Sequence, residues 1–100
     1  MYILITAANS AAAYQLKNTL DLPDIILGDY LELPDLMVKT GRMIKLPDPA
    51  KATYTHEMLK LCLDHNIGTI YILRKEEEQP LLAARQLFNE YNISLKLTGQ

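Results

Sequence analysis

The chain has 100 residues, of which 49% are hydrophobic and 22% charged, a globular composition that argues against disorder and fits one domain over residues 1–100. Its formal net charge of −2 provides no basic footprint for nucleic acid, and no apolar run approaches the ~20 residues of a membrane span. Cys62 is the single cysteine and no basic leader precedes the first strand, so we expect no disulfide, no signal peptide and a cytoplasmic location.

The first part of the chain has the pattern strand, helix, strand. Residues 2–6 form a short apolar run typical of a buried parallel strand, and residues 24–28 repeat that pattern. Between them, apolar side chains recur every four residues over 11–20, which predicts a helix capped by Asn9 or Ser10. The apolar face of this helix is expected to hold Ala12, Leu16 and Leu20.

The middle of the chain is less regular. Residues 33–38 fit either a short helix with Pro34 in its first turn or an irregular loop, and both interpretations stay open. Residues 43–46 predict a short strand, and a helix capped by Thr53 or Thr55 follows it. The apolar face of that helix is expected to include Leu59, Cys62 and Leu63.

The last part of the chain alternates in the same way. Residues 69–73 give the clearest strand after the first, and residues 74–79 predict a charged loop. Pro80 then opens a helix, because proline is tolerated in a first helical turn, and Asn92 ends it before a final strand over 93–97. The apolar residues of this helix fall at three- and four-residue steps: Leu81, Ala84, Phe88 and Tyr91.

Strands that alternate with helices imply right-handed crossovers and a parallel sheet covered on both faces. We therefore predict an α/β, three-layer Rossmann-like fold with a five-stranded parallel sheet in the order 3-2-1-4-5. In such a sheet the functional crevice lies beyond the carboxyl ends of the strands, at the topological switch point. This places residues 6–11, 28–31 and 74–79 together at one edge.

The turn after the first strand occupies the place of a glycine-rich phosphate-binding turn. Phosphate needs free backbone N–H groups at a helix N-terminus, and glycines let the backbone approach it closely. Here alanines stand in that turn, and Asn9 can adopt the left-handed conformation that a glycine would supply. Two interpretations stay open: Ala8, Asn9 and Ser10 contact a small anion or nucleotide, or the turn only caps the helix and packs it closely.

Three charged residues at the same edge are candidates for ligand binding. Asp29 lies about 20 residues after the first turn, where an acidic residue often contacts a ribose 2′-hydroxyl, although an Asp also commonly begins a turn. Arg74 could clamp a carboxylate or phosphate, and Glu77 could bind a cation or an amine. The alternative is a solvated loop whose acids favour the N-terminus of the next helix.

Catalytic and metal-binding patterns are not found in the sequence. Ser10 has no His and Asp partners at a motif spacing, so nucleophilic catalysis lacks support. His56 and Cys62 lie on different faces of one predicted helix, and Cys62 with His65 provides two ligands where zinc requires more. We therefore predict no catalytic residue and no metal site, with Cys62 as a core residue.

The order of these segments resembles the pre-ATP-grasp domain, the N-terminal Rossmann-like domain of carbamoyl-phosphate-synthase-like ATP-grasp proteins. The resemblance covers nearly the whole chain. It rests on residues 3–12, 28–29, 43–47, 70–74, 76–78 and 81–82.

The resemblance implies a non-catalytic accessory or binding domain that packs beside the ATP-grasp lobes and helps to form a substrate cleft for a small molecule. Its partner would be an ATP-grasp module or a second copy of the chain, and ATP would be bound only where such a module is present. The family's first turn corresponds to residues 7–11, its acidic strand end to Asp29 and its acidic loop to residues 76–78. The alternative is a nucleotide- or NAD(P)-binding Rossmann-type domain related to dehydrogenase and epimerase N-termini, with the cofactor on residues 8–11.

Overall fold

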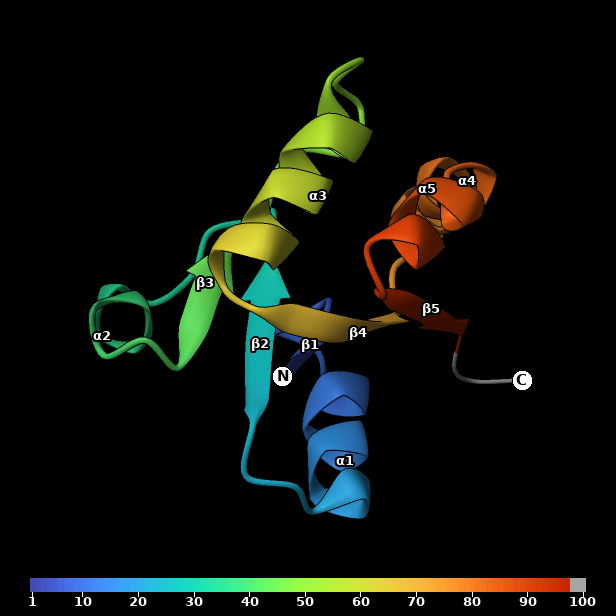
Figure 1. Cartoon of the computed structure of the whole chain (residues 1–100). Coiled ribbons are helices and arrows are strands. Elements are labelled where there is room, and N and C mark those ends of the chain that lie inside the picture. Colours follow the sequence, from blue (N-terminus) through green and yellow to red (C-terminus); the bar gives the residue numbers. More distant parts are fainter. Residues whose placement is uncertain (98–100) are drawn as a thin grey trace.

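The computed structural model describes residues 1–97, in which five strands alternate with helices (Figure 1). The strands are β1 (Tyr2–Ile5), β2 (Ile25–Asp29), β3 (Met43–Lys45), β4 (Ile67–Ile72) and β5 (Ser94–Leu97). The helices are α1 (Ala11–Leu20), α2 (Asp35–Lys39), α3 (Tyr54–Asp64), α4 (Lys75–Ala83) and α5 (Arg85–Glu90).

All five strands run parallel in the order β3-β2-β1-β4-β5, which confirms the predicted topology. The central strand is β1, and its Leu4 pairs with Ile26 of β2 on one side and with Ile70 of β4 on the other. The chain first builds the sheet outward through β2 and β3, and then returns across β1 to add β4 and β5. The switch point therefore lies between the carboxyl ends of β1 and β4.

Helices cover both faces of the sheet, so the three predicted layers are confirmed. In Figure 1, α3, α4 and α5 lie on one side of the strands and α1 lies on the other. Because successive strand side chains point to opposite faces, Leu4 packs in the core beneath α3, α4 and α5, whereas Ile5 packs beneath α1. The first core is the larger and contains the fully buried aromatic residues Tyr54 and Phe88.

The charged segment after β4 differs from the sequence prediction. Residues 75–79 are helical and not a loop, and Pro80 lies inside α4 and does not open it. Three acidic residues in the first turn favour the helix N-terminus, and Glu77 and Leu81 lie four residues apart on one buried face. These local gains outweigh the backbone hydrogen bond that Pro80 removes. The predicted single helix over 80–91 is divided at Ala84 into α4 and α5.

Three helical faces also differ from the predicted ones. Ala13 is buried and Ala12 is exposed, because the stripe of α1 follows the 3.6-residue period and not a strict step of four. On α3, Cys62 is buried as predicted, but Leu63 is 51% exposed because it lies one position further round the helix. Tyr91 follows the end of α5 and is exposed.

The ends of the helices settle the remaining alternatives. Ser10 is the N-cap of α1, and the segment around Pro34 forms the short helix α2 and not a loop. Thr53 immediately precedes α3, but its hydroxyl donates to Glu57 and caps no backbone N–H. The left-handed position in the first turn belongs to Ala7, with φ of 57°, and not to Asn9.

Candidate functional site

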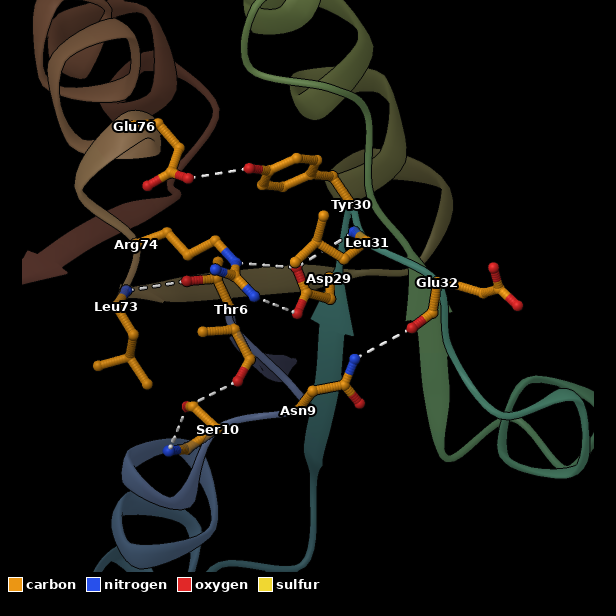
Figure 2. A network of polar contacts seen from close by, with 12 residues as sticks. Thr6, Asn9, Ser10, Asp29, Tyr30, Leu31, Glu32, Leu73, Arg74 and Glu76 are labelled. Carbon is orange, nitrogen blue, oxygen red and sulfur yellow. Dashed lines mark hydrogen bonds and ion pairs between the residues drawn. The ribbon is translucent and has the colours of Figure 1, made fainter.

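An ion pair crosses the carboxyl edge of the sheet at the switch point. Asp29 ends β2 and Arg74 follows β4, so the two side chains meet over the end of the central strand (Figure 2). The Arg74 Nε donates to Asp29 Oδ1 at 2.9 Å, and the Arg74 Nη2 donates to Asp29 Oδ2 at 2.8 Å. This two-point geometry is the strong, orientation-specific form of an arginine–carboxylate pair.

The Asp29 carboxylate is fully buried, and its protein partners satisfy it. Burial by itself raises the pKa of Asp29, but the hydrogen bonds from Arg74 and from the Leu31 N–H hold that pKa below its usual value. The Leu31 N–H lies 3.3 Å from Oδ1. Asp29 is therefore ionised at neutral pH, with both oxygens engaged inside the protein.

Tyr30 and Glu76 extend this arrangement toward the surface. The Arg74 guanidinium carbon lies 5.4 Å from the centre of the Tyr30 ring, within the range of a cation–π interaction. The Tyr30 hydroxyl donates to Glu76 Oε2 at 2.8 Å (Figure 2). The segment after β2 and the first turn of α4 are thus joined by two side-chain contacts in addition to the packing of the sheet.

Glu77 is fully buried, although the sequence placed it in a charged loop. The Tyr54 hydroxyl donates to its Oε2 at 3.1 Å, and its Oε1 has no hydrogen-bond partner among the described residues. Burial raises the pKa of Glu77 to about 7, although the hydroxyls of Tyr54 and Thr6 act in the opposite direction. The burial of Glu77 could have been predicted from its four-residue spacing to the apolar Leu81, because residues at that spacing share one face of a helix.

The first turn uses its polar groups locally. The Ser10 hydroxyl donates to the Ala7 carbonyl at 2.8 Å, and its oxygen accepts the Ala13 N–H at 3.2 Å, which is the usual N-cap arrangement. Ala8 is fully buried against the sheet. The turn therefore caps and packs α1, as one of the two open interpretations expected.

Asn9 and Thr6 tie this turn to its neighbours (Figure 2). The Asn9 Nδ2 donates to the Glu32 carbonyl at 3.0 Å, which links the start of α1 to the segment after β2. Thr6 is fully buried, and its Oγ1 accepts the Leu73 N–H at 2.8 Å, which joins the ends of β1 and β4. The sequence analysis missed Thr6, Tyr30 and Tyr54, because a single hydroxyl at a strand or helix end carries no motif.

The six residues singled out from the sequence do gather at one edge. Asn9, Ser10, Asp29 and Arg74 lie around the switch point (Figure 2), and Ala8 and Glu77 are fully buried. Beside the start of α1 lies a shallow hollow of about 430 Å³. Its lining residues are Ala7, Ser10, Ala12, Leu73, Arg74, Lys75 and Glu76.

Within residues 1–97, no group of three or more His, Cys, Asp or Glu side chains could hold a metal ion. Cys62 is fully buried, and that burial raises the pKa of its thiol to about 12, so it is an unreactive core residue as predicted. None of the helices in the described part combines the length and apolar character that a bilayer span requires. Neither a scan against protein-family models nor a search of curated proteins finds a match to the chain.

Proposed function

We propose that the chain is a non-catalytic accessory or binding domain of the pre-ATP-grasp type, which acts by docking to an ATP-grasp module or to a second copy of itself. The observation that carries the proposal is a group of exposed aliphatic side chains beside the closed carboxyl edge. The group, which we call the 31–38 patch, consists of Leu31, Leu36 and Val38. Leu36 and Val38 are two residues apart on α2 and point to different sides of that helix.

The 31–38 patch leaves large apolar area in water. Leu36 is 70% exposed, Leu31 is 44% exposed and Val38 is 42% exposed. The short helix α2 contains no buried residue, and its Met37 is only partly covered by the core beneath α1. A single exposed leucine is ordinary, but several in one short segment are typical of a surface that meets another protein.

The patch is held in place by the polar edge beside it. The Leu31 N–H donates to Asp29, and the Lys45 Nζ donates to the Leu31 carbonyl at 3.0 Å. The neighbouring Glu32 carbonyl accepts from Asn9. These bonds fix the backbone at Leu31 and Glu32, where the patch begins, and a preorganised segment loses less conformational entropy when it docks.

The contacts of the edge favour docking over nucleotide binding. A ribose-binding role for Asp29 requires a carboxylate that a hydroxyl can reach, and this carboxylate is fully buried with both oxygens bonded to Arg74. The Ser10 hydroxyl is engaged in capping, and no glycine in the first turn lets a pyrophosphate approach the backbone. The hollow beside α1, with Arg74 and Lys75 on its wall, is the feature that favours the alternative.

The pre-ATP-grasp type of the domain and the nature of its ligands are proposed from the resemblance. The Rossmann-like sheet and the order of the segments along it support a pre-ATP-grasp domain. Under this proposal the carboxyl edge borders a small-molecule substrate that the partner module binds, and ATP belongs to that module.

Sedimentation velocity tests the docking, with the chain alone over a range of concentrations and with an ATP-grasp module from the same genome added. We expect association in one of these two experiments, and we expect Leu36→Asn to weaken it at least tenfold. Leu63→Asn is the matched control, because Leu63 is 51% exposed on α3, on the opposite face of the sheet from α2. A chain that stays monomeric in both experiments, or equal effects of the two substitutions, would contradict the proposal.

A further inference from the structure

Three polar or charged side chains are buried in the described part of the chain, and Glu77 is the least satisfied of them. The other two are Thr6 and Asp29. Asp29 accepts two hydrogen bonds from Arg74 and one from a backbone N–H, whereas Glu77 accepts one from Tyr54. A buried carboxylate whose donors are all neutral is unfavourable, while a neutral carboxylic acid in the same place costs far less.

The groups that face Glu77 do not provide a cation for it. Tyr54 approaches from the first turn of α3 and donates its proton, and burial and Glu77 together raise the pKa of Tyr54, so it stays a neutral donor. Thr6 faces it from the end of β1, and its neutral hydroxyl also acts to lower the pKa of Glu77. Asp29 at the end of β2 opposes ionisation, and Arg74 favours it. The two bonds that Arg74 donates to Asp29 leave that guanidinium committed.

We propose that Glu77 is a proton-operated latch between the first turns of α3 and α4: the neutral acid holds the two helices together, and its ionisation opens the first turn of α4. The latch needs no docking partner and goes beyond the proposed function.

Opening follows from the burial of the charge, because the hydroxyls of Tyr54 and Thr6 only partly offset the loss of water around the carboxylate. The ionised Glu77 has two further routes to stabilisation: it can recruit Arg74 away from Asp29, or it can reach water. Arg74 immediately precedes α4, and Glu76 in the same turn holds Tyr30, so movement of this turn loosens both contacts that close the edge. The fraction of molecules with an open carboxyl edge is therefore smallest in acid and grows as the pH rises.

The size of the effect follows from proton linkage. Burial raises the pKa of Glu77 from its ordinary 4.5 to about 7, so the opened turn loses its proton at a lower pH than the closed one does. Between pH 5 and pH 8.5 the equilibrium constant for opening then rises roughly 70-fold, and most of the rise occurs below about pH 7.5.

Amide hydrogen exchange of the whole chain tests the latch, with rates corrected for the intrinsic effect of pH. The amides of Gln79 and Leu81 report opening of α4, and the amide of Ile70 in the central core reports global unfolding. We expect the α4 amides to lose protection by tens of fold between pH 5 and pH 8.5, and to be less protected than Ile70 at the upper pH. Glu77→Gln keeps an acceptor for Tyr54 and is expected to abolish this pH response, whereas the neighbouring Glu78→Gln is expected to retain it.

Three results would overturn the latch. The first is protection of the α4 amides that does not change with pH. The second is α4 protection that equals that of Ile70 at every pH, because the pH effect would then be on global stability alone. The third is a Glu77→Gln variant that keeps the wild-type pH response. None of these results bears on the 31–38 patch, so the latch and the docking proposal fail separately.

Discussion

Removal of the Arg74 guanidinium is the sharpest perturbation of the carboxyl edge. Arg74→Met keeps an unbranched apolar stem but deletes both bonds to Asp29, and it leaves a fully buried carboxylate with one backbone N–H as its partner. Breaking a buried ion pair by removing one partner costs about 3–5 kcal/mol. Arg74 is itself 21% exposed, so water can reach part of the site, and we expect about 3 kcal/mol, the lower end of that range. For a domain of this size that corresponds to a fall in Tm of roughly 12–24 °C.

Urea denaturation of the variant at several pH values provides the assay. In the wild type the folded-state pKa of Asp29 lies below its ordinary 3.8, so its stabilising contribution is present above that value and is lost as the pH falls through the folded pKa. Without Arg74, burial dominates and raises the pKa of Asp29, so the variant should gain stability as the pH falls. The double variant Asp29→Asn, Arg74→Met removes the buried charge and should recover most of the loss. An Arg74→Met variant within about 1 kcal/mol of wild type, or a double variant less stable than the single one, would show that the ion pair does not stabilise the fold in this way.

Three further substitutions test the interior and the first turn. Glu77→Gln should stabilise the protein at pH 8 by about 3 kcal/mol. The pKa of Glu77 is about 7 in the folded protein and 4.5 ordinarily, so the stability that depends on its proton is fully present below pH 4.5 and is lost as the pH rises to about 7. Equal urea midpoints for the two proteins at pH 8 would contradict this. Phe88→Ala should cost about 3–5 kcal/mol by leaving a cavity under α5, whereas the exposed Tyr91→Ala should cost under about 1 kcal/mol, and similar midpoints for the two would show that the core is placed wrongly. Ser10→Ala removes the N-cap of α1 and should lower stability by about 1 kcal/mol, as measured by thermal unfolding; no change would mean that the cap contributes nothing.

The strand order could be predicted from the sequence because its signals are local. Short apolar runs between helical segments mark parallel strands, and right-handed crossovers restrict their order. Leu4 and Ile5 show how such a strand is recognised. A strand in a sheet covered on both faces has consecutive apolar residues, and both of these residues are buried. The predicted order needed no information on individual contacts.

The prediction of a loop for the charged segment after β4 was wrong for an equally physical reason. Composition alone cannot separate a solvated loop from a helix whose first turn is acidic, and Pro80 offered a plausible but incorrect start. The helix begins earlier because Glu77 and Leu81 share one face, and that face is buried only when α3 packs on it. Tertiary packing decided the outcome.

The candidate site could be located from the sequence, but its internal contacts could not. Asp29 and Arg74 were both placed at the carboxyl edge, because the ends of parallel strands meet there. That they bond to each other across 45 positions depends on the strand register and on side-chain reach, which no local pattern contains. The same holds for Tyr54 and Glu77, which only the packing of α3 against α4 brings together.

Calorimetric titration of the chain with ATP, NAD and NADP tests whether the carboxyl edge binds a nucleotide, with the change in Tm as a second readout. Asp29 and Arg74 close the carboxyl edge on itself, and we propose that the chain works by docking. We therefore expect no saturable heat and no rise in Tm at millimolar nucleotide. Saturable binding that Asn9→Trp weakens would place a nucleotide on the first turn and contradict the docking proposal.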